Sequence, residues 1–371
     1  MKIENFVNIL ESDFFTGVPD SQLKSLCDYL YAKYGTDPHH HIVTANEGNA
    51  VALAAGYHLA TKQYPVVYMQ NSGEGNAVNP MASLMDDHVY GIPAIYVIGW
   101  RGEPGVHDEP QHVYQGIITC KLLELMGIDY FVITKETSDE EMKAKMLEYK
   151  KLLQTGKSVA FVIKKGALSN DNKVTYGNSY TDTRESIIET VIKYTGADPI
   201  VSTTGKASRE LFELREKYNQ GHQHDFLTVG SMGHSSSIAL GIAINKPNKR
   251  VWCIDGDGAL LMHMGALTCI GNYAPNNLVH IVINNECHET VGGMPTNTQK
   301  LKLTTIASAC GYQKCYQVND INELNKVLEI VISDKSLTFI EVKASVGARA
   351  DLGRPTSTAK ENKENFMKAL S

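Results

Sequence analysis

Short apolar runs alternate with longer stretches of mixed polarity along most of this chain. In the first half, runs rich in Val, Ile, Tyr and Phe predict buried strands at 41–45, 66–70, 94–98, 130–133 and 159–163, with helices between them. In the second half we expect strands at 200–203, 251–254, 278–283 and 338–342, and helices at 184–194, 208–218, 235–243, 259–270 and 360–370. The last helix carries Phe366, Met367 and Leu370 as its expected buried stripe. Such regular alternation is typical of an α/β fold.

A polar stretch divides the chain into two parts. Residues 170–182 are rich in Asn, Asp and Thr, and we interpret them as a linker between a domain at 1–169 and a domain at 183–371. A chain of 371 residues is long enough for two domains that each bury a core. The fold class that we expect is α/β, with two doubly wound parallel-sheet domains and no domain between them.

The composition of the chain argues against some kinds of binding partner. The formal net charge is −6 and 20% of the residues are charged, which argues against a nucleic-acid partner. The seven cysteines include no Cys-x-x-Cys pair and are expected to be reduced thiols. No apolar run approaches the ~20 residues of a membrane span, and the N-terminus lacks a signal-peptide core. We therefore expect a cytoplasmic protein without a membrane partner.

One βαβ unit carries the clearest chemical signal. Asp257 stands in Asp255-Gly-Asp-Gly-Ala259 directly after a predicted strand, and Asn285 follows the next predicted strand. Parallel neighbouring strands would bring both side chains to one edge of the sheet, where two oxygen ligands suit Mg²⁺. Gly256 and Gly258 would let a phosphate approach the backbone at a helix start. The alternative is an ordinary strand-to-helix turn followed by an Asx cap.

This Gly-Asp-Gly followed by Asn-Asn resembles the signature of the thiamine diphosphate-dependent decarboxylase superfamily. The resemblance implies that Asp257, Asn285 and the carbonyl of Cys287 bind Mg²⁺. It also implies that the diphosphate lies against a set of residues around the motif, with Thr204 and Gly205 adding amides; the cofactor-binding set is Thr204, Gly205, Gly230, Ser231, Met232, Gly256, Asp257, Gly258, Ala259, Asn285 and Glu47. An ordinary strand-helix turn remains the alternative for Thr204 and Gly205.

Two further positions follow from the same resemblance. Glu47 lies at a predicted strand-to-helix turn, and it would be the catalytic carboxylate that binds the pyrimidine ring and activates the cofactor. A glutamate placed there by the helix dipole is the alternative. In the turn at 229–234, the carbonyl of Gly230 would accept from the cofactor's amine and Met232 would wedge between its rings. A Met of the core is the alternative.

Four sequence blocks narrow the resemblance to the phosphonopyruvate decarboxylases. They are Gly17-Val-Pro-Asp-Ser21, Gly99-Trp-Arg-Gly-Glu-Pro-Gly105, Asp108-Glu-Pro-Gln-His112 and Asp351-Leu-Gly-Arg-Pro-Thr356. The resemblance implies a 2-oxoacid carboxy-lyase of phosphonate biosynthesis that converts 3-phosphonopyruvate to phosphonoacetaldehyde and CO₂. It also implies a homodimer or higher homo-oligomer whose subunits share active sites. Sulfopyruvate decarboxylation and a catalytically silent cofactor-binding regulator are the alternatives.

A substrate with a carboxylate and a phosphonate needs cationic and neutral donors. The candidate cations are Arg101, Arg349 and Arg354, which lie in Gly- and Pro-rich segments typical of site loops. The candidate neutral donors or proton carriers are Ser21, Asn71, Ser72, His107, Gln111, His112 and His288.

Overall fold

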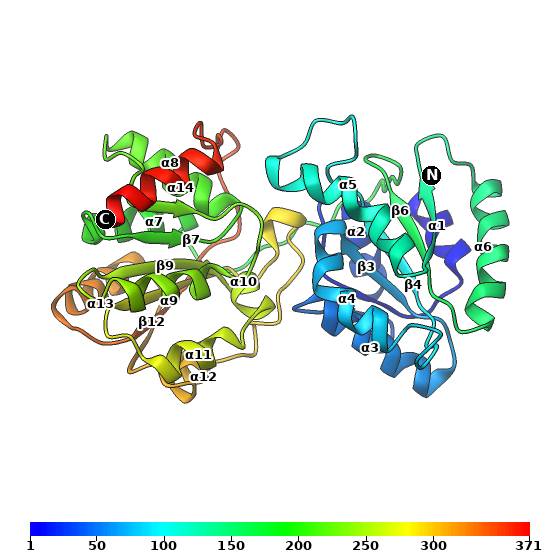
Figure 1. Cartoon of the computed structure of the whole chain (residues 1–371), viewed down its shortest axis with the longest axis horizontal. Helices are drawn as coiled ribbons and strands as arrows, with labels where there is room; N and C mark the ends of the chain where they lie inside the picture. Colours follow the sequence, from blue (N-terminus) through cyan, green and yellow to red (C-terminus); the bar gives the residue numbers. More distant parts are fainter. The chain divides into compact units, whose positions relative to one another are not determined.

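The structure, a computed structural model, describes residues 1–371 except for the side chain of Thr290. It forms two compact units (Figure 1). The first comprises Met1–Thr175 with Thr290–Met294, and the second comprises Tyr176–Glu289 with Pro295–Ser371. The chain passes from the first unit to the second between Thr175 and Tyr176, within the polar stretch at 170–182. Each unit is an α/β structure with a six-stranded parallel sheet, which confirms the expected fold class.

The sheet of the first unit has the strand order β2-β1-β3-β4-β6-β5. Its strands are β1 (Phe15–Gly17), β2 (His41–Val43), β3 (Val66–Gln70), β4 (Ile95–Gly99), β5 (Asp129–Ile133) and β6 (Val159–Ile163), all pairing in parallel. The central strands are apolar and buried at nearly every position. Parallel strands covered by helices on both faces have this continuous apolar pattern, which explains why the sequence located these strands.

Helices cover both faces of this sheet. On one face lie α3 (Glu47–Thr61), α4 (Glu74–Ser83) and the C-terminal part of α5 (Pro110–Leu125), whose buried residues share a core with β3, β4 and β6. On the other face lie α1 (Ile3–Leu10) and α6 (Asp139–Gln154), and α1 also contacts α2 (Lys24–Tyr34). There Phe161 of β6 meets Phe6 edge-on, with ring centroids 6.1 Å apart, and Tyr149 at 5.3 Å.

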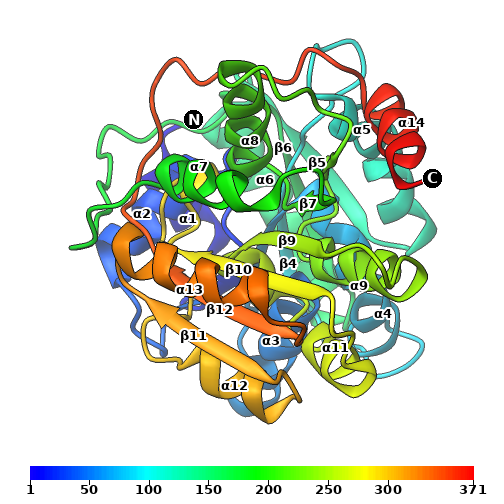
Figure 2. The same cartoon turned by 90° about the vertical axis from the view of Figure 1, so that its left-hand side faces the viewer.

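The sheet of the second unit has the strand order β11-β12-β10-β9-β7-β8. Its strands are β7 (Ile200–Ser202), β8 (Asp225–Leu227), β9 (Val251–Gly256), β10 (Leu278–Asn284), β11 (Lys314–Val318) and β12 (Thr338–Lys343). Figure 2 shows α7 (Arg184–Thr195), α8 (Lys206–Lys217) and α13 (Ile321–Ser333) on one side of this sheet. The opposite side is covered by α9 (Ser235–Asn245), α11 (Ala266–Tyr273) and α12 (Leu303–Ala309).

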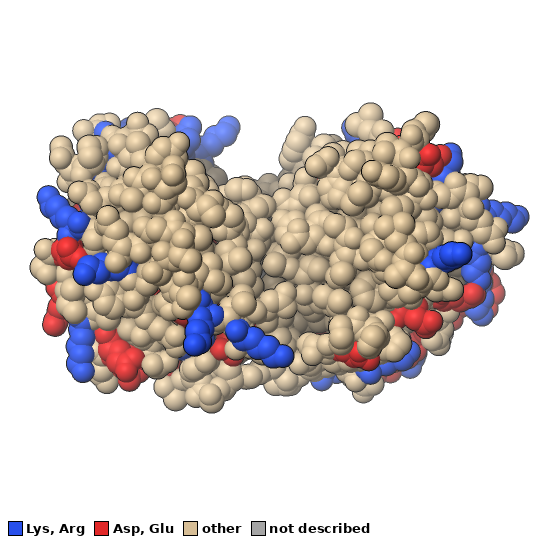
Figure 3. Space-filling view, turned by 90° about the horizontal axis from the view of Figure 1, so that it is seen from below, with Lys and Arg blue, Asp and Glu red and all other residues tan. Residues whose placement is uncertain are grey.

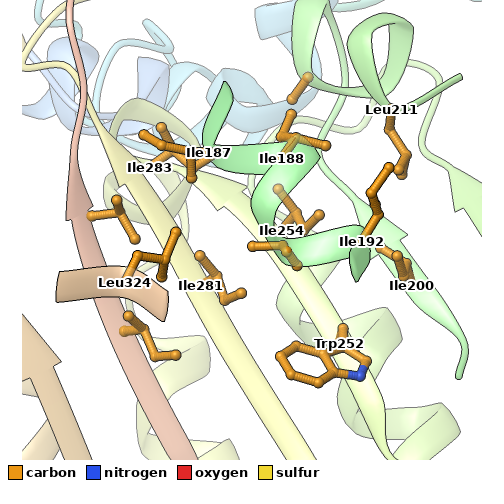
Figure 4. Packing of buried hydrophobic residues seen from close by; sticks show 14 of the residues in the cluster. Ile187, Ile188, Ile192, Ile200, Leu211, Trp252, Ile254, Ile281, Ile283 and Leu324 are labelled. Carbon is orange, nitrogen blue, oxygen red and sulfur yellow. The ribbon is translucent and has the colours of Figure 1, made fainter. Parts of the chain in front are cut away.

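Branched aliphatic side chains fill the space between α7 and the sheet. Ile187 and Ile188 of α7 face Ile254 of β9 and Ile283 of β10, and Trp252 lies further along β9 (Figure 4). All five side chains are buried. Truncating an isoleucine of this kind to alanine costs about 2–5 kcal/mol, because the transfer term and the cavity term add. This core holds β9 and β10 side by side, and these two strands carry the expected cofactor residues at their carboxyl ends.

Two expectations about helices were wrong. The helix expected at 259–270 is divided into α10 (Asp257–Met262) and α11, because His263 at φ −133° and ψ 43° leaves helical geometry. In α14 (Ala359–Leu370), Phe366 is buried but Met367 is 59% exposed. Asn362 is buried instead: its amide donates to the carbonyl of Asp225 at 2.8 Å and accepts from the amide of Leu227 at 3.1 Å. The edge strand β8 requires a polar partner there.

The strands β1, β8 and β11 and the helix α13 were not expected. β1 and β8 are only three residues long, and β8 begins at a charged residue, Asp225. The pairing of these strands with their neighbours therefore depends on tertiary contacts that no local pattern reveals.

Candidate active site

In each sheet the first strand of the unit has its next two strands on opposite sides, so the strand order reverses direction there. In the first unit the reversal lies between β1 and β3, and in the second it lies between β7 and β9. Ligands of open α/β sheets bind beyond the carboxyl ends of the strands at such a point. In the second unit this position is occupied by Thr204 after β7 and by Asp257 after β9. In the first unit it is occupied by Ser21, four residues beyond β1, and by Asn71 directly after β3.

Asp257 is the first residue of α10 and is 3% exposed. Its Oδ2 accepts hydrogen bonds from the hydroxyl groups of Thr296 at 2.6 Å and Thr298 at 3.2 Å. Burial raises the pKa of Asp257 to about 6, although the two hydroxyl groups act in the opposite direction. A buried carboxylate without a nearby cationic side chain among its hydrogen-bond partners suits a site that a divalent cation completes.

Glycine at position 258 keeps the backbone beside Asp257 accessible. A Cβ atom there would lie 3.3 Å from the ring of His288 and 3.4 Å from Cε of Met232. The structure therefore brings three predicted site residues, Gly258, Met232 and His288, into contact distance around the start of α10. His288 is 6% exposed, and burial lowers its pKa to about 4, so the imidazole is neutral near pH 7. Gly256 precedes this helix in an extended conformation, and Ala259 is buried in its first turn.

The turn at 229–234 has an unusual backbone. Gly230 and Gly233 have φ values of 70° and 87°, and the non-glycine Ser231 has φ 45°. The amide of Gly230 donates to the hydroxyl of Thr204 at 3.0 Å, so the segments after β7 and β8 meet here. Gly205 has φ 90° and precedes α8, a conformation that side chains with a Cβ rarely adopt.

Asn285 lies directly after β10 and is 6% exposed. Its Oδ1 accepts from the amide of Cys287 at 3.2 Å, and its Nδ2 donates to Glu289 at 2.9 Å. Since β9 and β10 pair in parallel up to Gly256 and Ile283, Asp257 and Asn285 leave the same edge of the sheet. This set of a carboxylate, an amide oxygen and nearby carbonyl groups fits Mg²⁺, which prefers oxygen ligands.

Sequence reasoning missed several residues of this region. Thr296 and Thr298 bond to Asp257, and Glu289 bonds to Asn285, to Arg184 at 3.0 Å and to Lys206 at 2.7 Å. Burial opposes the ionisation of Glu289, but the charges of Arg184 and Lys206 outweigh it and lower the pKa of this carboxyl group. A polar residue four positions after Asn285 was the only signal for Glu289 in the sequence.

In the first unit, Glu47 begins α3 and is 5% exposed. Asn46 caps the helix by accepting from the amide of Gly48 at 2.8 Å, and the amide of Asn76 donates to Glu47 Oε2 at 2.8 Å. Burial raises the pKa of Glu47. A Cβ atom at Gly73 would come within 2.6 Å of the Glu47 side chain, so glycine is required where this carboxyl group passes. The geometry produces a buried carboxyl group whose pKa lies above its ordinary value, because burial penalises the charged form.

A polar cluster lies at the carboxyl ends of β3 and β4. The amide of Asn71 donates to the carbonyl of Arg101 at 2.8 Å and accepts from its backbone N–H at 3.1 Å. The guanidinium of Arg101 donates to Asp108 through two nitrogens, at 2.8 and 2.5 Å, and to Ser21 Oγ at 3.1 Å. The structure therefore unites Ser21, Asn71 and Arg101 in one hydrogen-bond network, with Asn71 buried beneath it.

The other substrate candidates occupy varied positions. His112 on α5 is half-buried, and burial with the charge of Arg101 lowers its pKa to about 4. Ser72 donates to Gln70 at 2.7 Å, while His107 is exposed and Gln111 is partly exposed. In the second unit, Arg349 pairs with Glu185 at 2.9 Å, with Asp351 at 3.1 Å and with Glu213. Arg354 is exposed and lies three residues after Asp351.

Charge on the visible surface does not indicate a polyanionic partner. On the face shown in Figure 3, Lys and Arg side chains are interspersed with Asp and Glu. Within the part of the chain that the structure describes, none of the helices combines the length and the apolar character that crossing a membrane requires.

Comparison with protein families identifies the class of fold and site. Residues 4–123 match the family described as "Thiamine pyrophosphate enzyme, N-terminal TPP binding domain". Residues 203–342 match "Thiamine pyrophosphate enzyme, C-terminal TPP binding domain". The first match contains Glu47 and the second contains Asp257 and Asn285. The two units are thus the two cofactor-binding domains of a thiamine diphosphate (thiamine pyrophosphate) enzyme.

Individual relatives narrow the family. The phosphonopyruvate decarboxylase of Streptomyces viridochromogenes is 33% identical over 367 residues, covering 94% of this chain and 89% of the relative. That of Streptomyces hygroscopicus is 33% identical over 357 residues, covering 91% and 86%. The sulfopyruvate decarboxylase of Methanosarcina acetivorans is 27% identical over 322 residues, covering 81% of each chain. The chain belongs to the phosphonopyruvate decarboxylase family of thiamine diphosphate-dependent enzymes, as the sequence blocks predicted.

Proposed function

We propose that this protein is a 2-oxoacid carboxy-lyase that converts 3-phosphonopyruvate to phosphonoacetaldehyde and CO₂ in phosphonate biosynthesis, with thiamine diphosphate and Mg²⁺. The observation that carries the proposal is the similarity to two phosphonopyruvate decarboxylases over about nine tenths of the chain. It is supported by the burial of Glu47 and Asp257 in the two cofactor-binding domains. Neither carboxyl group is satisfied by an ion pair in the described structure, and each is placed after a strand.

In the second unit, Asp257, Asn285 and the carbonyl of Cys287 would hold Mg²⁺. Backbone groups around Gly256, Gly258 and Ala259, together with those of Thr204, Gly205 and Ser231, would hold the diphosphate at the start of α10 and beside α8. The carbonyl of Gly230 would accept from the aminopyrimidine, and Met232 would be the apolar wedge against the cofactor's two rings. Bound thiamine diphosphate supplies the nucleophilic carbon and accepts the electron pair that CO₂ leaves behind.

Glu47 would bind the pyrimidine nitrogen of the cofactor. Burial raises the pKa of Glu47, which favours a carboxyl group that shares a proton with that nitrogen. The bond from Asn76 fixes one carboxyl oxygen, so the group has a defined orientation. Glu47 is therefore the residue proposed as catalytic.

The candidate donors for the substrate come from both units. Arg101 presents a guanidinium that Asp108 orients, and Ser21 lies within hydrogen-bond distance of it. Asn71 uses its amide to hold the backbone of Arg101, so its proposed role is to position that arginine. Ser72, His107, Gln111 and His112 are proposed as neutral donors in the first unit, and His288, Arg349 and Arg354 as contacts from the second.

Sulfopyruvate is the second candidate substrate, because a sulfopyruvate decarboxylase is also similar over 81% of the chain, at lower identity. A silent cofactor-binding regulator is disfavoured, because Glu47, Asp257 and Asn285 are all retained. The test is CO₂ release measured side by side on phosphonopyruvate, sulfopyruvate and pyruvate with added Mg²⁺ and thiamine diphosphate. We expect the highest kcat/KM on phosphonopyruvate. A higher value on sulfopyruvate would overturn the substrate, and no release from any of the three would overturn the decarboxylase.

The proposal includes a homodimer or higher homo-oligomer in which Glu47 of one subunit and Asp257 of another serve the same cofactor. A two-fold contact would generate two equivalent sites at once. It also includes a cytoplasmic location, which the seven free thiols support, since cysteines in reducing compartments remain unpaired.

A further inference from the structure

The carboxylate of Glu289 accepts a hydrogen bond from the side chain of Asn285. Glu289 begins the 3₁₀ turn η2 (Glu289–Val291), and its side chain is 7% exposed. Five N–H groups converge on its two oxygens: Lys206 Nζ at 2.7 Å, Arg184 Nη1 and Nη2 at 3.0 and 3.4 Å, Asn285 Nδ2 at 2.9 Å and the amide of Gly347 at 3.2 Å. With both oxygens occupied in this way, Glu289 has little capacity left to bind a cation directly.

The contact decides which way the amide of Asn285 points. A carboxylate only accepts hydrogen bonds, so the nitrogen of Asn285 must face Glu289. A backbone N–H only donates, so the oxygen of Asn285 must face the amide of Cys287, 3.2 Å away. These two partners of opposite character exclude the flipped amide. The second lone pair of Oδ1 is thereby available at the edge of the sheet from which Asp257 also emerges.

Charge within the surrounding cluster is balanced. Arg184 also binds Glu210 through two nitrogens, at 2.6 and 2.7 Å. Arg184, Lys206, Glu210 and Glu289, which we call the Glu289 cluster, therefore contain two positive and two negative groups. Because the cluster is neutral, it adds little net field at a neighbouring cation. Any effect of the cluster on Mg²⁺ binding would therefore come from how it orients the metal ligands.

We propose that Glu289 is a positioning residue for the metal site, which holds the amide of Asn285 with its oxygen toward the cation. This inference rests on the proposed Mg²⁺ site at Asp257 and Asn285. Arg184 and Lys206 in turn hold Glu289. Removing a residue that hydrogen-bonds to a metal ligand typically lowers metal affinity by about 10- to 100-fold.

The test is a calorimetric titration of Mg²⁺ into the full-length protein with saturating thiamine diphosphate. Glu289→Gln cannot satisfy Asn285 and the two cations together, because its own amide nitrogen must face one of them. We expect Mg²⁺ affinity to fall about 10- to 100-fold. The matched control is Glu189→Gln, which breaks the exposed pair with Lys217 on the same unit and should leave the affinity unchanged.

Making Glu289→Gln in an Asn285→Asp protein separates the orientation of the Asn285 amide from the other effects of the substitution. In the Asn285→Asp background both side-chain ends are oxygens, so no flip can matter, and Glu289 becomes a repelling neighbour. Adding Glu289→Gln there should leave Mg²⁺ affinity unchanged or raise it. An equal loss in both backgrounds, or no loss in the wild-type background, would overturn the proposal.

Two further variants keep the outcome interpretable. Asp257→Ala tests the site itself: if it leaves Mg²⁺ affinity unchanged, the proposed cofactor site is wrong, whereas a loss there with none in Glu289→Gln defeats only the positioning role. If thermal unfolding without ligands shows that Glu289→Gln is unfolded, Glu289→Asp replaces it. That variant keeps the charge and withdraws the carboxylate by one methylene, so we expect a smaller loss of affinity, and an unchanged affinity would overturn the proposal.

Discussion

The hydroxyl of Thr296 donates a 2.6 Å hydrogen bond to Asp257 Oδ2, although 39 residues separate the two in sequence. The hydroxyl of Thr298 lies 3.2 Å from the same oxygen and 2.7 Å from Thr296 Oγ1. All three side chains are buried. The segment that returns after β10 therefore fixes one oxygen of the carboxylate that would bind the cation.

Thr296→Val should weaken Mg²⁺ binding by about 10- to 100-fold, because the carboxylate of Asp257 loses its shortest orienting bond. Thr298→Val removes the longer bond and should have the smaller effect. Calorimetric titration with thiamine diphosphate present measures both. A larger loss in Thr298→Val than in Thr296→Val would contradict this assignment.

Glu47→Gln should remain folded and bind the cofactor, yet lose turnover by ~10²–10⁴-fold, the usual scale for a positioned acid-base group. The amide keeps the shape of the side chain but cannot exchange a proton with the cofactor. Steady-state kinetics together with thermal unfolding test this expectation. Near wild-type turnover in a folded variant would refute the catalytic role.

Glu74 predicts a pH dependence of stability. It is 1% exposed, its Oε1 has no hydrogen-bond partner in the described structure, and burial raises its pKa from 4.5 to about 9. The folded state therefore keeps a proton that the unfolded chain releases above pH 4.5. The stability from this group is fully present below pH 4.5 and falls by up to about 1.4 kcal/mol per pH unit as pH rises toward 9.

Glu74→Gln removes that dependence, so its advantage over wild type in the free energy of unfolding should grow from pH 5 to pH 9. Urea denaturation at pH 5, 7 and 9 measures the difference, with the exposed Glu140→Gln on α6 as the control. A constant difference between Glu74→Gln and wild type across this range would show that Glu74 is not held protonated.

Arg349 and Arg354 are both candidates for binding the phosphonate, and we expect their substitutions to have different effects. Arg349 pairs with three carboxylates, so Arg349→Met should lower the melting temperature and should change substrate preference less than Arg354→Met does. Arg354→Met should lower kcat/KM for phosphonopyruvate about 10- to 100-fold and much less for pyruvate, since a charge-assisted hydrogen bond contributes ~1.5–3 kcal/mol. Equal losses on both substrates in Arg354→Met would exclude this arginine as the phosphonate contact.

Mixing two inactive variants tests the shared site. If Glu47 and Asp257 of different subunits serve one cofactor, a mixed dimer of Glu47→Gln and Asp257→Ala chains contains one intact site. With free exchange about half the dimers are mixed, so roughly a quarter of wild-type activity should return. Native mass spectrometry confirms that mixed dimers form. Mixed dimers without activity would mean that both domains of one chain bind the same cofactor.

The sequence by itself located most of the central strands and predicted that Asp257 and Asn285 leave the same edge of one sheet. Strands such as β4, β6 and β10 are buried on both faces, so their apolar runs stand out without knowledge of their neighbours. Asp257 and Asn285 follow such runs directly, so their place at the edge of the sheet could be inferred from connectivity alone.

Only the tertiary structure decided the contacts that hold these residues. Thr296 bonds to Asp257 across 39 residues, Arg184 bonds to Glu289 across 105, and Asn362 bonds to Asp225 of β8 across 137. Hydrogen bonds over such separations leave no periodic trace in the chain, because each depends on where the fold places the partner. The division between α10 and α11 was hidden for a related reason. The apolar pattern continues through 259–270, while the backbone at His263 follows the packing around it.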